Sequence, residues 1–287
     1  MVELSFSRTA LYVSDLDGTL LRSDGTVSAV TCDAINRLIS NGLRFTVATA
    51  RSPARTLSVV RGLQMELPLI CLNGAVTVDP CTGRWLSMAA IDRRSVAELL
   101  TVGASVGLSP FLMGEDSGRE ALMYTRPRGR AQEQFMAQRS GEPRLREVEA
   151  LRPLDQTLSV TFVGEFERLE ALKGLLAEAA IGALAFRLMD YPEIEGAATL
   201  DVSRNGVDKV VRLAELASSL GLQAEEVVVF GDHLNDLPMF GWAGTAVAVD
   251  NARPEVIAVA DIRCMSNDAD GVANFLTTCE RGRICSS

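Results

Sequence analysis

The sequence predicts an α/β fold, a doubly wound Rossmann-like parallel-sheet core with an inserted α+β domain. Two observations lead to this prediction. Near-continuous apolar runs alternate with helical segments at both ends of the 287-residue chain, which is typical of a parallel sheet covered on both faces. Between these ends, over residues 83–190, the expected strands follow one another locally, which favours a separate α+β unit.

The N-terminal segment contains three expected strands and two expected helices. Ser28 is a good N-cap for a helix that ends at Asn41-Gly42, and Pro53 is typical of the first turn of a helix. We expect strands at ALYVS (10–14), RFTVA (44–48) and LPLICL (67–72), and helices at 29–40 and from Pro53 onward. These elements form the first half of the core, residues 1–82.

The middle segment starts with a hairpin in AVTVDPCTGRWLSM, whose turn is Asp79 to Gly83. A helix at 93–106, a strand at TLSVTFV, a helix at 167–180 and a strand at LAFRLM follow. After these, ATLDVS (198–203) is expected as a strand that returns to the core, followed by a helix ending in Gly221 and by the strands EEVVVF and TAVAV. The expected second half of the core is therefore residues 191–287.

Composition excludes several classes of protein. The formal net charge of −9 disfavours general nucleic-acid binding, which needs a positive surface. No apolar run is long enough to cross a bilayer, and the N-terminus MVELSFSRTAL does not resemble a signal peptide, so we expect a cytoplasmic protein without membrane contact. The six cysteines are far apart without a CxxC pair, which predicts free thiols rather than a zinc site.

Reactive side chains follow four of the expected core strands. Asp15 and Asp17 follow the first strand in DLDGT, and Thr49 follows the second. Lys209 comes after ATLDVS in the first turn of a helix, and GDHLND (231–236) comes after VVVF. Each alone is an ordinary turn or helix cap. Because the carboxyl ends of parallel strands meet at one edge of a sheet, we expect all four to form one site.

This set of side chains suits phosphoryl transfer, which requires a phosphoryl group to be positioned and its charge neutralised. Mg²⁺ prefers oxygen ligands, so Asp15 and Asp232 are the natural side-chain ligands, with a backbone carbonyl near Asp17 as a third. Lys209 supplies a fixed positive charge, and Thr49 with nearby amides holds phosphate oxygens. Asp17 is then available to donate a proton to the leaving oxygen and to remove one from water.

The motifs resemble those of the haloacid dehalogenase superfamily of phosphohydrolases. DLDGTL (15–20), Thr49 in ATAR, Lys209 in GVDKV and GDHLNDLPMF (231–240) occur in the family's order. LICLNGA (69–75) and the tail TAVAVDNARPEVIAVAD are similar to the Cof-type phosphatases, which carry a large α/β cap domain inserted after the third core strand. The resemblance implies that residues 83–190 are such a cap.

The resemblance also implies the chemical roles of the acidic residues. Asp15 would be the nucleophile that becomes an aspartyl-phosphate and would also bind Mg²⁺. Asp17 would be the general acid and base, and its backbone carbonyl would be a second metal ligand. Asp232 would complete the protein ligands of the metal, and Asp236 would support both the metal and Lys209 without binding the metal directly.

The remaining motif residues would bind the substrate. Thr49 and the backbone amide of Ala50 would hold the phosphate, Asn235 would contact it, and Lys209 would stabilise the charge on both nucleophile and phosphate. The family often has glycine where this chain has Ala50. Alanine is the smallest replacement, so the amide contact survives where φ is negative.

The sequence therefore predicts a Mg²⁺-dependent phosphatase that hydrolyses small phosphate monoesters, such as a sugar phosphate or a phosphorylated cofactor, as a monomer or homodimer. A phosphomutase with similar core motifs and a non-catalytic sensor of a phosphate ligand are the alternatives. Ion pumps of the superfamily are excluded, because they have Thr at the position of Asp17. The pattern leaves open the role of His233 and that of the basic loop YTRPRGR, in which Arg126, Arg128 and Arg130 are either solvated or contact substrate.

Overall fold

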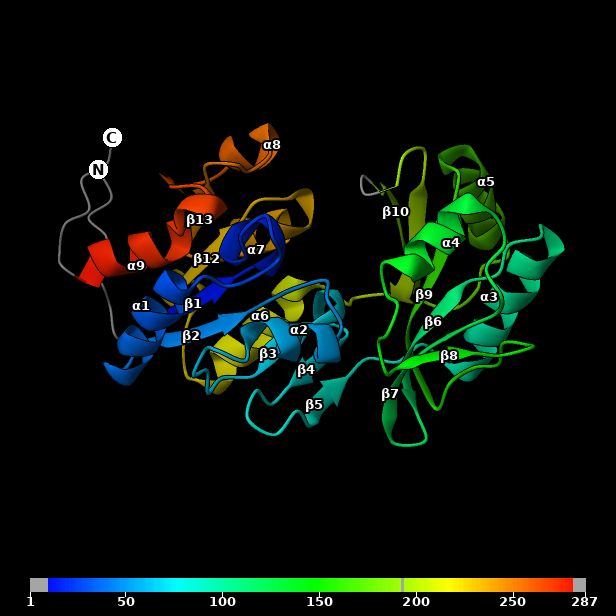
Figure 1. Cartoon of the computed structure of the whole chain (residues 1–287), viewed down its shortest axis with the longest axis horizontal. Helices are drawn as coiled ribbons and strands as arrows, with labels where there is room; N and C mark the ends of the chain where they lie inside the picture. Colours follow the sequence, from blue (N-terminus) through cyan, green and yellow to red (C-terminus); the bar gives the residue numbers. More distant parts are fainter. Residues whose placement is uncertain (1–9, 192–193, 281–287) are drawn as a thin grey trace. The chain divides into compact units, whose positions relative to one another are not determined.

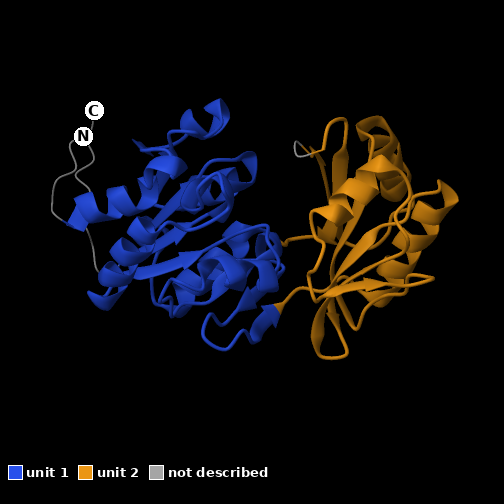
Figure 2. Cartoon of the chain, viewed as in Figure 1, with its two compact units in different colours: residues 1–87, 208–287 blue, residues 88–207 orange. Residues whose placement is uncertain are grey.

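The computed structural model describes residues 10–191 and 194–280, and the chain divides into two compact units (Figure 2). The first, the core unit, comprises residues 1–87 and 208–287, and the second, the cap unit, comprises residues 88–207. The core unit carries a parallel sheet and the cap unit a mainly antiparallel one. This confirms the predicted fold class.

The centre of the core unit is a five-stranded parallel sheet with the order β14-β13-β12-β1-β2 (Figure 1). Its strands are β1 (Leu11–Ser14), β2 (Arg44–Val47), β12 (Val227–Gly231), β13 (Thr245–Val249) and β14 (Ile262–Cys264). All residues of β1, β12 and β13 are buried, which explains their near-continuous apolar sequences. β1 lies between β2 and β12, so the first and last parts of the chain meet at the centre of the sheet.

Helices flank this sheet, and α1 packs against α9 while α6 packs against α7. They are α1 (Ala29–Ser40), α2 (Pro53–Val60), α6 (Lys209–Ser219), α7 (Leu237–Trp242), α8 (Pro254–Ile257) and α9 (Gly271–Glu280). Ser28 caps α1 by accepting a hydrogen bond from the backbone of Thr31 at 3.0 Å, and Pro53 begins α2, as the sequence predicts.

A three-stranded sheet, β3-β4-β5, extends the core unit. Its strands are β3 (Leu69–Cys71), β4 (Val76–Val78) and β5 (Trp85–Met88). A parallel bridge between Ala48 and Ile70 places β3 next to the end of β2. Asp79 forms the predicted turn of the hairpin, because its Oδ1 accepts hydrogen bonds from the backbone of Cys81 and Thr82 at 2.8 and 2.9 Å.

The cap unit contains a six-stranded sheet with the order β10-β11-β9-β6-β7-β8. Its elements are α3 (Arg93–Ser105), β6 (Phe111–Asp116), β7 (Arg119–Tyr124), α4 (Arg130–Ala137), β8 (Leu145–Glu147), β9 (Gln156–Gly164), α5 (Phe166–Glu178), β10 (Leu184–Asp190) and β11 (Ala198–Arg204). Leu99 of α3 and Leu172 of α5 pack with Phe162 and Leu200 in one buried core, so these two helices cover one face of the sheet.

The expected boundary at residue 190 differs from the structure. β11, the strand expected to return to the core, pairs antiparallel with β9 and β10 and therefore belongs to the cap unit. Its alternating burial, with Leu200 and Val202 in the apolar core, is what any half-buried strand shows, so the pattern did not specify the sheet. The chain re-enters the core unit only at Asp208. Within the described ranges, no helix is both long and apolar enough to cross a membrane.

Candidate active site

Asp15 lies at the carboxyl end of β1, where the chain leaves the centre of the core sheet. Its backbone N–H donates to the carbonyl of Phe230 at 3.0 Å, which continues the pairing of β1 with β12 by one residue. The following turn, Leu16–Leu20, closes with a hydrogen bond from the N–H of Leu21 to the carbonyl of Leu16 at 2.8 Å. The side chain of Asp15 is thus fixed at the end of a buried strand, with 5% of the residue exposed.

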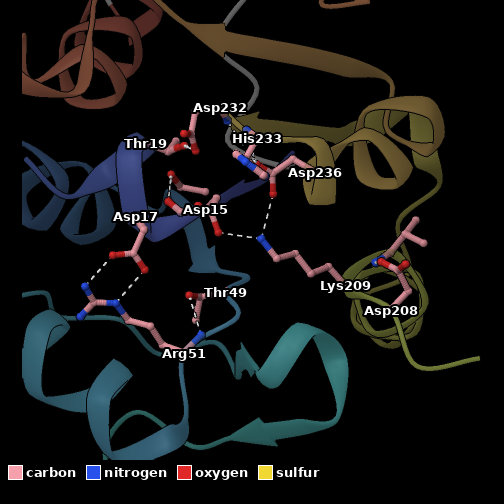
Figure 3. A network of polar contacts seen from close by, with 12 residues as sticks. Asp15, Asp17, Thr19, Thr49, Arg51, Asp208, Lys209, Asp232, His233 and Asp236 are labelled. Atoms are coloured by element: carbon pink, nitrogen blue, oxygen red, sulfur yellow. Dashed lines mark hydrogen bonds and ion pairs between the residues drawn. The ribbon is translucent and has the colours of Figure 1, made fainter. Parts of the chain in front are cut away.

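Lys209 forms the central ion pair of the site. Its Nζ donates to Oδ1 of Asp15 at 2.6 Å and to Oδ1 of Asp236 at 2.8 Å (Figure 3). The lysine is fully buried, so each of these contacts is shielded from water. Lys209 is the first residue of α6, as predicted, but the strand that precedes it, β11, belongs to the cap unit rather than to the core sheet.

The LNG turn (72–74) after β3 fixes the start of α6. All three of its residues have positive φ, and a Cβ at Gly74 would lie 2.3 Å from the carbonyl oxygen of Asp208. Only glycine allows this approach, which places the backbone before Lys209 directly against the turn. Arg212 of α6 reinforces the contact by donating from Nε to the carbonyl of Gly74 at 2.9 Å. The NGA element of the sequence therefore positions the lysine of the site.

Asp232 approaches the Asp15 turn from the end of β12. Thr19 donates from Oγ1 to Oδ1 of Asp232 at 2.9 Å. A Cβ at Gly18 would lie 2.4 Å from Oδ2 of Asp232, and Gly18 has φ of +75°. Glycine at this position is therefore required twice, by the backbone conformation and by the close approach of the carboxylate.

Asp236 is completely buried, and both of its oxygens are already used. Oδ1 accepts from Lys209, and Oδ2 accepts from the backbone N–H groups of Asp232 and His233, each at 3.2 Å. Asp236 thus connects Lys209 to the loop that carries Asp232. Its role in supporting a metal stays a prediction.

The electrostatics of the site follow from three carboxylates grouped around one ammonium. One oxygen from each of Asp15, Asp232 and Asp236 lies within 4.8 Å of the others. Burial, assisted by the charges of Asp236 and Asp232, raises the pKa of Asp15 against the opposing effect of Lys209, and a bound divalent cation would favour the ionised form of Asp15. Burial also raises the pKa of Asp232 to about 6, against the hydrogen bond from Thr19. Burial disfavours the charged form of Lys209, but the attraction of Asp15 and Asp236 outweighs it and raises the lysine pKa.

These residues fit a divalent cation. With all groups ionised, three carboxylates and one ammonium leave two uncompensated negative charges in a largely buried space, which a divalent cation would neutralise. The donors are all oxygens, the ligand type that Mg²⁺ prefers. Because both oxygens of Asp236 already accept hydrogen bonds, Asp15 and Asp232 are the side chains best able to bind the ion.

The side chain of Asp17 is directed elsewhere. Arg51 donates from Nε and Nη2 to the two oxygens of Asp17 at 2.8 and 2.6 Å, a bidentate pair. In Figure 3 the Asp17 carboxylate points toward Arg51 rather than toward Lys209. The Asp17 side chain is 57% exposed, whereas that of Arg51 is 14% exposed. The two acids of DLDGT therefore have different surroundings, one buried against a lysine and one at the surface against an arginine.

The predicted substrate-binding residues flank this centre. Thr49 is buried, and its Oγ1 accepts a hydrogen bond from the N–H of Arg51 at 3.1 Å, while Ala50 is exposed. Asn235 lies on the short turn Leu234–Asp236, next to Asp236. His233 is exposed, and partial burial together with the charge of Arg253 lowers its pKa.

Three residues of the site were not predicted. Thr19 holds Asp232, Arg51 holds Asp17, and Asn251 donates from Nδ2 to the carbonyl of Gly18 at 2.7 Å. Thr19 and Arg51 each belong to a predicted motif, so the motif gave a signal for their position but not for their partner. Asn251 lies in the tail that resembles the Cof-type phosphatases, and nothing in its surroundings in the sequence indicates a contact with Gly18.

The motif order and the geometry of Asp15, Lys209 and Asp232 agree with a match between residues 12–276 and the model of haloacid dehalogenase-like hydrolases. The chain belongs to this family. Pyridoxal phosphate phosphatase YbhA of Escherichia coli is 28% identical over 282 residues, which cover 93% of this chain and 97% of that protein. The 5-amino-6-(5-phospho-D-ribitylamino)uracil phosphatase YitU of Bacillus subtilis is 25% identical over 270 residues, which cover 93% and 96%.

Solved structures show the same fold. A haloacid dehalogenase-like hydrolase from Bacteroides thetaiotaomicron superposes with a TM-score of 0.80 at 24% identity, covering 93% of this chain and 98% of that one. The likeness therefore extends over both units of this member of the haloacid dehalogenase-like hydrolases.

Proposed function

We propose that this hydrolase of phosphoric monoesters acts on small phosphorylated metabolites with bound Mg²⁺, through an aspartyl-phosphate formed on Asp15. The observation that carries the proposal is the buried Asp15–Lys209–Asp236 chain of hydrogen bonds, 2.6 and 2.8 Å long, beside Asp232. A carboxylate attacks phosphorus only when it is ionised and when its repulsion by the phosphate is cancelled. Lys209 supports both conditions.

Each residue has one task in the proposed reaction. An oxygen of Asp15 attacks the phosphorus while Lys209 stabilises the negative charge of the phosphoryl oxygens. Asp15 and Asp232 would hold Mg²⁺, which would supply positive charge to offset the negative charge of the phosphoryl oxygens. Thr49 and the backbone amide of Ala50 hold the remaining phosphate oxygens. The second step is attack of water on the phosphorus of the aspartyl-phosphate, which releases phosphate and restores Asp15.

Asp17 is the proposed proton donor and acceptor. In the first step it protonates the oxygen of the leaving alcohol, and in the second it removes a proton from the attacking water. Its exposed side chain allows exchange of this proton with solvent and with the leaving group. The pair with Arg51 fixes the direction of the carboxylate in this structure, so we expect the substrate to compete with Arg51 for Asp17.

The class of substrate is proposed from the relatives. The relatives from Escherichia coli and Bacillus subtilis are named as phosphatases of pyridoxal phosphate and of 5-amino-6-(5-phospho-D-ribitylamino)uracil, both small phosphorylated molecules. We propose a phosphorylated cofactor or sugar phosphate for this chain, acted on in the cytoplasm by a monomer or homodimer.

A phosphate-release screen over phosphorylated cofactors and sugar phosphates tests the proposal. With Mg²⁺ present, the wild type is expected to release phosphate from at least one of them, and Asp15→Asn, which keeps the shape but removes the nucleophile, is expected to release none. Asp33→Asn, an exposed acid on α1, is the matched control and should retain full activity. A mutase would instead return the phosphoryl group to a sugar, and a sensor would bind phosphate without turnover. Either result contradicts the proposal.

A further inference from the structure

A cavity lies in the cap unit, which contains none of the proposed catalytic residues. It has a volume of about 860 Å³ and is lined by residues of α3, of the segment between α3 and β6, of the loop after β7, and of the end of β8 with the segment that follows it. Sites for small ligands commonly measure about 300–1,000 Å³ and combine apolar walls with a few polar groups. The size of this cavity is therefore that of a binding site for a small molecule.

The apolar wall of the cavity belongs to the edge of the cap core. Leu100 of α3, Leu108, Val148 and Leu151 line it. Leu108 is itself part of the buried core, and the other three are partly buried residues that pack against that core. Apolar surface that is half covered in this way favours a ligand with an apolar or aromatic body.

The lining of the cavity also includes two basic side chains. Arg126 and Arg128, on either side of Pro127 in the loop after β7, both line the cavity. Both side chains are exposed, and neither forms an ion pair with any residue in 10–191 or 194–280. In a chain with a net charge of −9 and many carboxylates, two neighbouring arginines without such a partner favour an external anion.

Hydrogen bonds hold the loop that carries the two arginines in place before any ligand binds. Gln132 of α4 is buried, and its Oε1 accepts from the N–H of Arg128 at 2.9 Å while its Nε2 donates to the carbonyl of Ser109 at 3.1 Å. The hydroxyls of Ser109 and Thr125 form a hydrogen bond of 2.7 Å across the two segments. The loop that carries the two arginines is therefore tied to the segment before β6, which reduces the entropy lost on binding.

Two carboxylates limit the charge of the ligand. Glu147 and Glu149 line the cavity from the segment that carries Val148. They would repel a second anionic group, so only one end of the ligand is expected to be negative.

We propose that this cavity binds a small amphipathic anion, an apolar or aromatic body with a single phosphate, sulfonate or carboxylate group held by Arg126 and Arg128. All residues that line this cavity belong to the cap unit.

Anilinonaphthalene sulfonate has this chemistry, and N-phenylnaphthylamine has the same rings without the charge. Titration of the full-length protein, followed by probe fluorescence and calorimetry, should show one sulfonate bound per chain and weaker binding of the neutral probe. Loss of a charge-assisted contact is expected to lower sulfonate affinity about tenfold in Arg126→Gln and in Arg128→Gln. Arg130→Gln is the matched control, since it removes the same charge at the first residue of α4, close in sequence but outside the cavity lining, and it should leave the affinity unchanged.

Two further measurements distinguish this site from others. Ala104→Phe, which fills the cavity from α3, should weaken both probes, and thermal melting checks that the variants fold. Asp15→Asn, which changes the core site and leaves the cavity lining intact, should leave the sulfonate affinity unchanged. The proposal is overturned if Asp15→Asn changes the sulfonate affinity, if the neutral probe binds as tightly as the sulfonate, or if Arg126→Gln and Arg128→Gln both bind like Arg130→Gln.

Discussion

Replacing Gly18 with alanine is a sharp test of how the turn after Asp15 and the loop of Asp232 fit together. At φ of +75° an alanine costs about 1–2 kcal/mol in backbone energy. Its Cβ would also lie 2.4 Å from Oδ2 of Asp232, a distance that no pair of such atoms adopts, so the carboxylate has to move. That movement breaks or lengthens the 2.9 Å hydrogen bond from Thr19. Such a bond to a charged group contributes about 1.5–3 kcal/mol.

The expected result is a selective loss of metal affinity. A change in what holds a metal ligand typically lowers affinity about 10–100-fold, so Gly18→Ala should need correspondingly more Mg²⁺ for half-maximal phosphate release. Gly25→Ala is the matched control, because Gly25 has a similar φ of +77° and a Cβ added there would have no atom within 4 Å. Gly25→Ala therefore carries the backbone cost of a positive φ without a steric clash. If both variants show the same Mg²⁺ dependence as the wild type, Asp232 is not a metal ligand whose position depends on Gly18 and Thr19.

Three further outcomes are expected. Lys209→Met removes the charge that balances Asp15 and Asp236 and leaves their buried carboxylates unpaired. We therefore expect no phosphate release and a free energy of unfolding in urea that is lower by about 3–5 kcal/mol. A decrease below about 1 kcal/mol would show that Lys209 does not balance these charges. Asn251→Ala removes the 2.7 Å bond to the carbonyl of Gly18, so calorimetry should show about tenfold weaker Mg²⁺ binding, and unchanged binding would leave Asn251 with no part in the site. Burial raises the pKa of the Cys264 thiol to about 12, so very little of it is ionised at pH 8. After brief iodoacetamide treatment, peptide mapping should find the exposed Cys81 alkylated well before Cys264. Equal alkylation rates would contradict this expectation.

Much of the fold could be predicted because its signals are local. The helix starts at Ser28 and Pro53 depend on residues next to them in sequence, and the buried strands of the core read as apolar runs. β11 could not be assigned, because the alternation of Leu200 and Val202 with polar residues fits either sheet. The partner of a strand depends on contacts that the strand's own residues do not encode.

The residues of the site could likewise be predicted where their signal is local in the sequence. Asp15, Lys209 and Asp232 were predicted, since each lies in a motif that combines a chemical group with a turn. The pairing of Asp17 with Arg51 was not, because it joins two motifs 34 residues apart and depends on side-chain directions that only the folded core sets. Whether Asp17 also offers its backbone carbonyl to the metal stays a prediction.

Trapping the phosphorylated enzyme shows directly whether Asp15 is the nucleophile. Asp17→Asn removes the group proposed to activate water, so the aspartyl-phosphate formed with an aryl phosphate and Mg²⁺ should break down slowly and survive an acid quench. Mass spectrometry of the digested protein is expected to find one phosphoryl group, on Asp15. Phosphate release by the wild type together with no phosphoryl group on Asp15 of the quenched variant, or with one on another residue, would contradict the mechanism.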